Sequence, residues 1–199
     1  AISDLLEGMM YCYKITGDIQ YRTWFKQLLD QWILKAWNDD DHMFYLLNND
    51  GNRLADASQV YSGWPNVVVA SLCWAWREFG EDSYLKKAEL HFKAVHDNLI
   101  VNRLITHSVN WIPGHYSVVD RTNRLHAEYT RACFDLYYTT GDPVYRTLAE
   151  DYWNQLKAKA KKTYGYAQIN TDDFTVDNAY GPGVIWEQSL LYVMAMRIT

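Results

Sequence analysis

The sequence predicts an all-α fold built from repeated antiparallel helical hairpins. The phrase Gly-x-x-x-Tyr occurs three times, at Gly17, Gly80 and Gly141, and these glycines stand 63 and 61 positions apart. Each phrase follows one segment with helical spacing of apolar residues and precedes another. A period this long marks a repeated supersecondary unit, so each unit is predicted to be a helix, a tight turn and a second helix.

The first unit is predicted to cover residues 1–60. Apolar positions from Ile2 to Tyr13 fit a helical stripe. Gly17 is expected to end this helix, because a helix-ending residue with positive φ costs least as glycine. Asp18 is a suitable cap for the next helix, which is predicted at Tyr21–Trp37.

The second and third units repeat this arrangement. Their first helices are predicted at 67–79 and about 123–138, and their second helices at 84–99 and from Pro143 to about Lys161. Pro143 falls in the first turn of its helix, where proline is tolerated. The chain is thus predicted to form a single domain over 1–199, with units at 61–122 and 123–183 and a half unit at 184–199 that holds a seventh helix.

Long connections are predicted at the end opposite the short turns. They cover roughly 38–65, 98–122 and 162–183, and loops of this length in a helical domain are usually functional or mobile. Two are predicted to contain β-hairpins: 44–54, where Asp-Gly is a strong hairpin signal, and 164–174, where alternation returns around an Asn-Thr-Asp-Asp turn.

Composition and charge exclude several classes. A chain of 199 residues can bury one substantial core, and its 9 Trp and 16 Tyr are expected there or in a cleft that stacks flat ligands. The formal net charge of −5 argues against nucleic-acid and anionic-membrane partners. No apolar run could span a bilayer and no signal peptide precedes the repeats, so we expect a soluble protein, either cytoplasmic or secreted with its signal removed.

The three cysteines are predicted to be structural. Cys12, Cys73 and Cys133 fall in apolar helical stretches at similar places in the repeat, which indicates small buried fillers rather than a disulfide set. The sequence has no Cys-x-x-Cys pair and no helical His-x-x-x-His pair. We therefore expect no metal site and no cofactor.

Helical hairpins with short back turns, long front loops and a Thr-Gly-Asp-x-x-Tyr phrase resemble the (α/α) toroids of carbohydrate enzymes. These include six-hairpin glycosidases, N-acylglucosamine 2-epimerase-like proteins, polysaccharide lyases and the helical domain of glucuronyl C5-epimerases. The stretch Leu125–Asp142 carries the resemblance most clearly. The resemblance implies an (α/α) toroid or partial toroid, with β-hairpin loops on one face and a carbohydrate substrate.

A complete six-hairpin toroid needs about twelve helices, whereas the sequence predicts seven. The chain is therefore expected to be either a portion of a larger toroid or a shorter, open or four-hairpin version. Further helical hairpins, from the same or another chain, are the expected protein partners.

The favoured function is a glycoside hydrolase that acts on an oligo- or polysaccharide. Such enzymes commonly use two carboxylates, one as acid and one as base or nucleophile. We assign Glu187 and Glu128 as this pair, with Asp173 in reserve; each glutamate could instead be a solvated first-turn residue stabilised by the helix dipole. The acidic run at 39–41 is expected to form a solvated turn.

The alternative is a polysaccharide lyase or uronate epimerase. That chemistry needs a base to remove the proton next to a carboxylate, and groups that stabilise the resulting charge. The middle loop supplies His115 or Tyr116 as the base, with His107 nearby, and Asn110 with Arg121 as the stabilisers.

Rim aromatics are the expected sugar-binding residues, because flat rings stack on sugar faces; the candidates are Trp64, Trp111 and Tyr166. A non-catalytic helical-repeat binding module would use the same hairpins without a catalytic site. A terpenoid- or peptide-cyclising toroid would share the architecture, but the sequence has no Asp-x-x-Asp-Asp motif and no zinc-ligand set to favour it.

Overall fold

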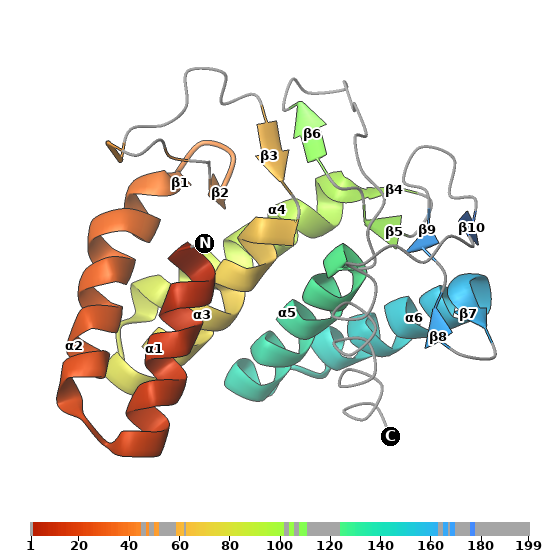
Figure 1. The fold of residues 1–199 in the computed structure, drawn as a ribbon. Helices are drawn as coiled ribbons and strands as arrows, with labels where there is room; N and C mark the ends of the chain where they lie inside the picture. Colours follow the sequence, from red (N-terminus) through yellow and green to blue (C-terminus); the bar gives the residue numbers. More distant parts are fainter. Residues whose placement is uncertain are drawn as a thin grey trace.

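A computed structural model of the chain describes residues 2–44, 47, 50–51, 59–61, 63–101, 104–105, 108–110, 124–162, 165–166, 168–169 and 176–177. Within these ranges the fold consists of three antiparallel helical hairpins (Figure 1). The paired helices are α1 (Ile2–Thr16) with α2 (Ile19–Leu28), α3 (Gly63–Phe79) with α4 (Asp82–Leu99), and α5 (Arg124–Thr140) with α6 (Pro143–Ala160). None of these helices is both long enough and apolar enough to cross a membrane.

The three predicted turns are confirmed. Gly17, Gly80 and Gly141 have φ values of 70°, 71° and 74°, a conformation that glycine adopts without the steric cost of a Cβ. Each glycine N–H donates to the carbonyl four residues earlier, at 2.8 Å in all three turns, and so closes the preceding helix. The repeated phrase is therefore a helix stop.

The second helices of the outer two hairpins begin with aspartate caps, as predicted for the first. An Asp18 carboxylate oxygen accepts a hydrogen bond from the Gln20 N–H, and Asp142 accepts one from the Val144 N–H, each at 2.9 Å. These bonds satisfy backbone donors that a helix start leaves without a partner.

We expect the turn glycines to be far less replaceable than a helical glycine. Gly80→Ala should lower the free energy of unfolding by about 1–2 kcal/mol, because alanine is strained at positive φ. Gly8→Ala is the matched control: it lies inside α1 with open space around its Cα, and alanine should raise stability by about 0.5–1 kcal/mol. Urea unfolding of both variants checks this, and equal effects would contradict it.

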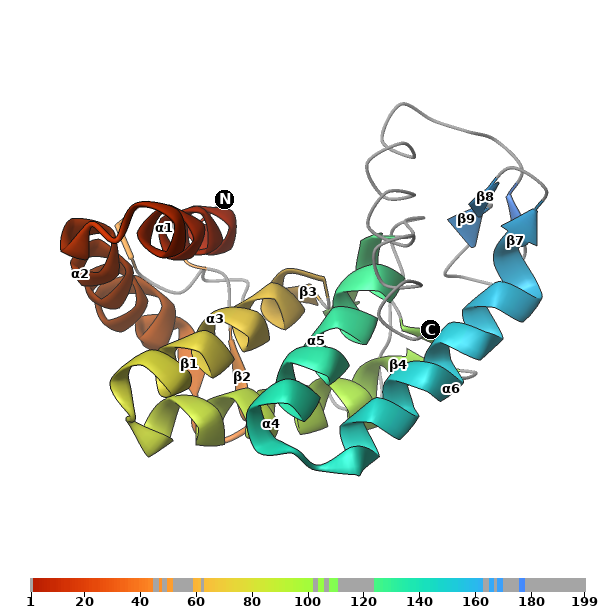
Figure 2. The ribbon, with the colours of Figure 1, turned by 90° about the horizontal axis from the view of Figure 1, so that it is seen from below.

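The helices form two curved layers (Figure 2). Helices α1, α3 and α5 line the inner, concave side of the arc, and α2, α4 and α6 line its outer side. Helix α3 lies at the centre and packs against α1, α4 and α5. The core between the layers is aromatic; for example, the Trp74 ring lies 4.4 Å from the Phe25 ring, centroid to centroid.

Short antiparallel strand pairs gather at the end of the assembly opposite the glycine turns, here named the strand end (Figure 1). Helix α2 leads there through a π-helical turn at Leu29–Ile33 and a 3-10 turn at Leu34–Ala36, so the predicted helix to Trp37 is regular only as far as Leu28. The pairs are β1 (Trp37–Asn38) with β2 (Met43–Phe44), β4 (Ile100–Val101) with β5 (Leu104–Ile105), β7 (Lys161–Lys162) with β8 (Gly165–Tyr166), β9 (Gln168–Ile169) with β10 (Val176–Asp177), and β3 (Gln59–Tyr61) with β6 (Ser108–Asn110).

A strand pair that was not predicted precedes the predicted hairpin at 44–54: Phe44 pairs with Trp37, and residues 39–42 form the turn between these strands. Most of the predicted hairpin lies outside the described residues, although Asp50 is in a turn and Gly51 has a φ of 77°. Asp41 builds the turn at 39–42, because its carboxylate accepts hydrogen bonds from the Met43 N–H and the Asn38 side chain, both at 3.1 Å. The acidic run is thus a turn, as predicted.

Other loop predictions have mixed outcomes. Strands β9 and β10 are antiparallel on either side of the predicted Asn-Thr-Asp-Asp turn, which agrees with a hairpin there. The pairing of β3 with β6 joins two different loops and was not predicted. The predicted seventh helix at 184–198 lies outside the described residues, and the unit boundaries stay a prediction.

Two of the three cysteines are buried, as predicted, whereas Cys12 is partly exposed. Burial raises the pKa of the Cys73 thiol to about 12, so little reactive thiolate forms near neutral pH. In a Cys12→Ser variant we expect no reaction of Cys73 or Cys133 with a thiol reagent at pH 8 until denaturant is added. Rapid reaction of either thiol in the folded protein would contradict this packing.

Candidate functional site

A cluster of charged side chains links the inner helices α1 and α5. Arg131 of α5 donates from two guanidinium nitrogens to the two carboxylate oxygens of Glu7 of α1, one of them at 3.2 Å. The same guanidinium lies 3.5 Å from an Asp135 oxygen and 4.0 Å from a Glu128 oxygen. We name these four residues the Arg131 cluster.

The cluster is largely shielded from water. The Arg131 side chain is 14% exposed and that of Glu128 only 3%. Burial by itself lowers the pKa of Arg131, but the hydrogen bonds to Glu7 and the negative charges of Asp135, Glu7 and Glu128 outweigh it and hold that pKa above its ordinary value. One cation therefore faces three carboxylates in a place where charge interactions are strong.

The repeat explains how residues so far apart in the sequence meet. Counted from the turn glycines, Glu7, Ala70 and Arg131 occupy the same position in the first, second and third hairpins. They therefore belong to one level of α1, α3 and α5, the helices that line the inner layer. The middle member is alanine, which carries no charge, so the two charged members pair with each other.

The cluster extends along α5 from the half nearer the strand end to the half nearer the glycine turn: Glu128 lies in the first half, Arg131 in the middle and Asp135 in the second half. Glu7 falls in the first half of α1, and α1 and α5 begin at the strand end (Figure 1). Helix α5 also packs against β5 of the middle loop. Glu7 and Glu128 are therefore the members of the cluster nearest the strand end.

The structure describes only part of the predicted site. Glu128 is fully described, and only the backbone is described for Trp64 in α3, Asn110 in β6 and Tyr166 in β8. The remaining predicted residues lie outside the described residues: His107, Trp111, His115, Tyr116, Arg121, Asp173 and Glu187. Glu7, Arg131 and Asp135 were missed by sequence reasoning, although the matching repeat positions of Glu7 and Arg131 were a usable signal.

A second candidate is a hollow of about 510 Å³ between α4, α5 and α6. Its lining includes His96, whose Nδ1 lies 2.6 Å from the Tyr129 hydroxyl, and three polar residues of α6, namely Asp151, Asn154 and Gln155. Burial raises the pKa of Tyr129 above its ordinary value, so its hydroxyl stays protonated. The His96–Tyr129 bond holds the inner layer to the outer one at the strand end.

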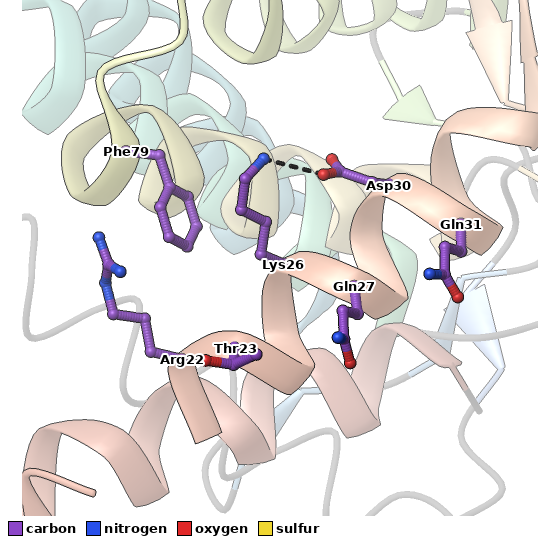
Figure 3. Close-up of a pocket in the computed structure, with 7 residues that line it drawn as sticks. All are labelled: Arg22, Thr23, Lys26, Gln27, Asp30, Gln31 and Phe79. Atoms are coloured by element: carbon purple, nitrogen blue, oxygen red, sulfur yellow. Dashed lines mark hydrogen bonds and ion pairs between the residues drawn. The ribbon is translucent and has the colours of Figure 1, made fainter. Parts of the chain in front are cut away.

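The third candidate is a hollow of about 290 Å³ on the outer helix α2, beside the turn of the second hairpin (Figure 3). The Lys26 ammonium there lies 2.8 Å from an Asp30 oxygen, and the Arg22 guanidinium lies 4.5 Å from the centre of the Phe79 ring. Arg22 also binds Glu78 at 2.5 Å, and Lys26 binds Glu81 at 2.8 Å. These bonds fasten the first hairpin to the second.

The exposure of the charged side chains distinguishes the α2 hollow from the Arg131 cluster. The two cations of the α2 hollow are satisfied by acids of the same surface, which is typical of a structural contact. The carboxylates of the Arg131 cluster, by contrast, are shielded from water: their side chains are 3–23% exposed, against 26–47% for the acids bound to Arg22 and Lys26. Within the described ranges no group of three or more His, Cys, Asp or Glu is placed to hold a metal ion. Acid–base chemistry by carboxylates is what this arrangement can supply.

No sequence family matches the chain, and no curated protein matches it either. Solved structures do match. The chain aligns over 98% of its length with cellobiose 2-epimerase from Spirochaeta thermophila, at 11% identity and a TM-score of 0.77, and covers 58% of that protein. A D-mannose isomerase aligns at 14% identity and a TM-score of 0.77; the alignment covers 98% of this chain and 52% of the isomerase. A family 105 glycoside hydrolase from C. acetobutylicum aligns at 14% identity and a TM-score of 0.73; the alignment covers 96% of this chain and 55% of the hydrolase.

At these identities the likeness establishes the fold. The chain spans about half the length of each of these structures, so they contain further residues with no counterpart here. Its helical hairpins, with short turns at one end and strand pairs at the other, agree with the fold that the resemblance implied. The chain therefore has the fold of the (α/α)-toroid proteins, over about half the length of the toroids that it matches.

Proposed function

We propose that the protein is a carbohydrate-active enzyme, and that it hydrolyses a glycosidic bond in an oligo- or polysaccharide. The observation that carries the proposal is the Arg131 cluster, a shielded group of carboxylates on the inner helices near the strand end. Support comes from the fold, because similar structures include a family 105 glycoside hydrolase and an unsaturated glucuronyl hydrolase from a streptococcus.

Hydrolysis needs one carboxyl group that donates a proton and one that acts as base or nucleophile. We assign Glu128 to the first role, because it is a buried carboxyl group that lies 4.0 Å from the Arg131 guanidinium. Glu7 is held by two hydrogen bonds from Arg131, which fix its orientation. We keep Glu187 as the proposed partner of Glu128, with Asp173 in reserve.

Epimerisation is the second candidate. Two structures with a TM-score of 0.77 are a cellobiose 2-epimerase and a D-mannose isomerase. The proposed base is His115 or Tyr116, with His107 nearby, and Asn110 with Arg121 would stabilise the charge that develops. Support for a role of the middle loop is that Asn110 pairs with Gln59, which ties this loop to the preceding one at the strand end.

Aromatic side chains of the strand end would complete either site. Trp64, Trp111 and Tyr166 are the proposed residues that stack on sugar rings. Trp64 and Trp111 belong to the second unit and Tyr166 to the third, so a sugar bound by all three would contact two units of the chain.

A glycan panel tests the proposal. The purified chain is incubated with neutral and uronic-acid oligosaccharides, and three signals are recorded: new reducing ends, absorbance near 235 nm from an unsaturated uronate, and uptake of deuterium from solvent at a sugar carbon. Reducing ends alone support hydrolysis, reducing ends together with absorbance near 235 nm support elimination by a polysaccharide lyase, and deuterium uptake alone supports epimerisation. Absence of all three signals across the panel would contradict an enzyme of this class and favour a binding module.

A further inference from the structure

All three nitrogens of the Arg131 guanidinium face carboxylate groups of this chain. Nη1 and Nη2 donate to the two oxygens of Glu7, so one edge of the guanidinium already holds a bidentate carboxylate. On the other edge, Nε lies 3.5 Å from an Asp135 oxygen. An arginine recognises a carboxylate best through two parallel N–H groups, and acids of this chain face both edges that offer such a pair. Arg131 is therefore a poor binding group for the carboxylate of a substrate.

The other cations of the inner helices lie at the opposite end. Among the described side chains of α1, α3 and α5, the remaining lysine and arginine residues are Lys14 and Arg77. Both fall in the last turn of their helix, at the end of the glycine turns (Figure 1), and Arg77 donates to the Thr139 hydroxyl. Within the described part of these helices, a sugar near the strand end thus meets no lysine or arginine other than the occupied Arg131.

A substrate carboxylate could reach Arg131 only by displacing Glu7. That exchange would break two charge-assisted hydrogen bonds and bring a second anion beside a glutamate whose side chain is only 23% exposed. Water screens like charges weakly in such a shielded place, so the two anions would repel each other strongly. Asp135, which is 18% exposed, adds to this repulsion.

Hydroxyl groups meet no such obstacle. Each carboxylate oxygen has two lone pairs, so Glu7 can accept a hydrogen bond from a sugar hydroxyl while it keeps its bonds to Arg131. The bidentate pair also holds both oxygens in fixed positions, which favours a defined set of hydroxyl partners. The chemistry of the pair therefore suits a neutral sugar and opposes a uronic acid.

We propose that Glu7 is a specificity-determining residue that restricts the site to neutral sugars. By occupying Arg131, Glu7 acts as an internal competitor of a substrate carboxylate, and its own charge excludes uronic acids. This role rests on the proposed function, because the sugar must bind at the Arg131 cluster. A uronic acid would bind well only where Glu7 no longer holds the guanidinium.

Matched pairs of sugars test the proposal in the unaltered chain. Cellobiose and maltose are each compared with the acid that has a carboxylate in place of the hydroxymethyl group of the non-reducing glucose. Isothermal titration calorimetry gives the dissociation constants, and chromatography shows whether each sugar is hydrolysed. We expect each neutral disaccharide to bind about 10–100-fold more tightly than its acid, because a like charge beside Glu7 opposes binding.

Two variants of Glu7 test its role directly. Glu7→Gln removes the charge and keeps the shape, and Glu7→Ala leaves both Nη groups of Arg131 without this carboxylate. Each should shift the ratio of the two dissociation constants toward the acid, by about tenfold for glutamine and by more for alanine. Glu78→Gln is the matched control: it removes the same charge from the ion pair with Arg22, in the last turn of α3, and should leave the ratio unchanged.

The ratio separates selection from stability. Partial unfolding weakens the binding of both sugars alike, and circular dichroism shows whether each variant keeps the helical content of the parent. Unchanged ratios in both folded Glu7 variants overturn the role of Glu7. Acids that bind the unaltered chain as tightly as their neutral partners overturn it without any variant, as does binding of none of the four sugars.

Hydrolysis and selection can fail separately. A chain that selects the neutral sugars but hydrolyses neither of them contradicts the proposed hydrolysis and leaves the selection by Glu7 standing. Hydrolysis of the acids in preference to the neutral sugars supports a hydrolase and overturns the selection.

Discussion

Replacement of Arg131 by methionine is expected to lower the free energy of unfolding by about 3–5 kcal/mol, the range for breaking a buried ion pair from one side. Methionine keeps much of the aliphatic volume of arginine and removes its charge. Glu7 then loses both hydrogen bonds from the guanidinium, and the shielded Glu128 and Asp135 lose the cation beside them. Urea unfolding, followed by tryptophan fluorescence and by circular dichroism, gives the change.

Arg146→Met is the control for this prediction. Arg146 forms an ion pair with Glu150 one helical turn away, at 2.7 Å, on the surface of α6. Exposed pairs of this kind contribute little, so stability should change within experimental error. If both arginine variants unfold at the same urea concentration, the Arg131 cluster does not hold α1 to α5 as the structure indicates.

Replacement of Glu128 by glutamine is expected to reduce turnover by about 10²–10⁴-fold, the usual contribution of a positioned acid or base. Glutamine has the same shape but cannot donate or accept the catalytic proton. Because Glu128 is buried beside Arg131, the substitution preserves packing and removes only one charge. Steady-state kinetics on the glycan found active in the panel would give kcat and KM separately, and the loss should fall on kcat.

Glu89→Gln is the matched control. Glu89 lies on the outer helix α4, where it accepts a hydrogen bond from the Tyr145 hydroxyl at 3.4 Å. The same chemical change there should leave turnover unchanged. Full activity of Glu128→Gln, with a folded variant and an unaltered unfolding midpoint, would remove Glu128 from the catalytic machinery and leave it a structural member of the Arg131 cluster.

Much of the fold was predictable because its signals are local. A helix stop needs only a glycine with positive φ, so three such glycines at a constant period defined three hairpins. The strand pairs of the strand end were harder to predict from the sequence. The acidic run at 39–41 indicated a turn, but strands β1 and β2 on either side of it have only two residues each, too few for an alternating pattern to reveal them. The pairing of β3 with β6 joins two loops whose contact depends on how the hairpins pack.

The site was predictable only in part, for a related reason. Glu128 was found from its place near a helix start, but its partners were not. Arg131 and Glu7 are 124 residues apart, and only the curvature of the inner layer brings them together. The repeat offered the missing signal: Glu7 and Arg131 share one position and carry opposite charges, with the small Ala70 between them.

The most direct test of this account is a crystal structure of the Glu128→Gln variant with a bound sugar. Crystals would be soaked in cellobiose and, separately, in an unsaturated glucuronyl disaccharide. The account predicts a sugar at the strand end of the inner helices, with an oxygen of the scissile bond within hydrogen-bond distance of residue 128. A sugar bound only in the hollow between α4 and α6, or only on the outer helices, would contradict the assignment of the Arg131 cluster as the catalytic site.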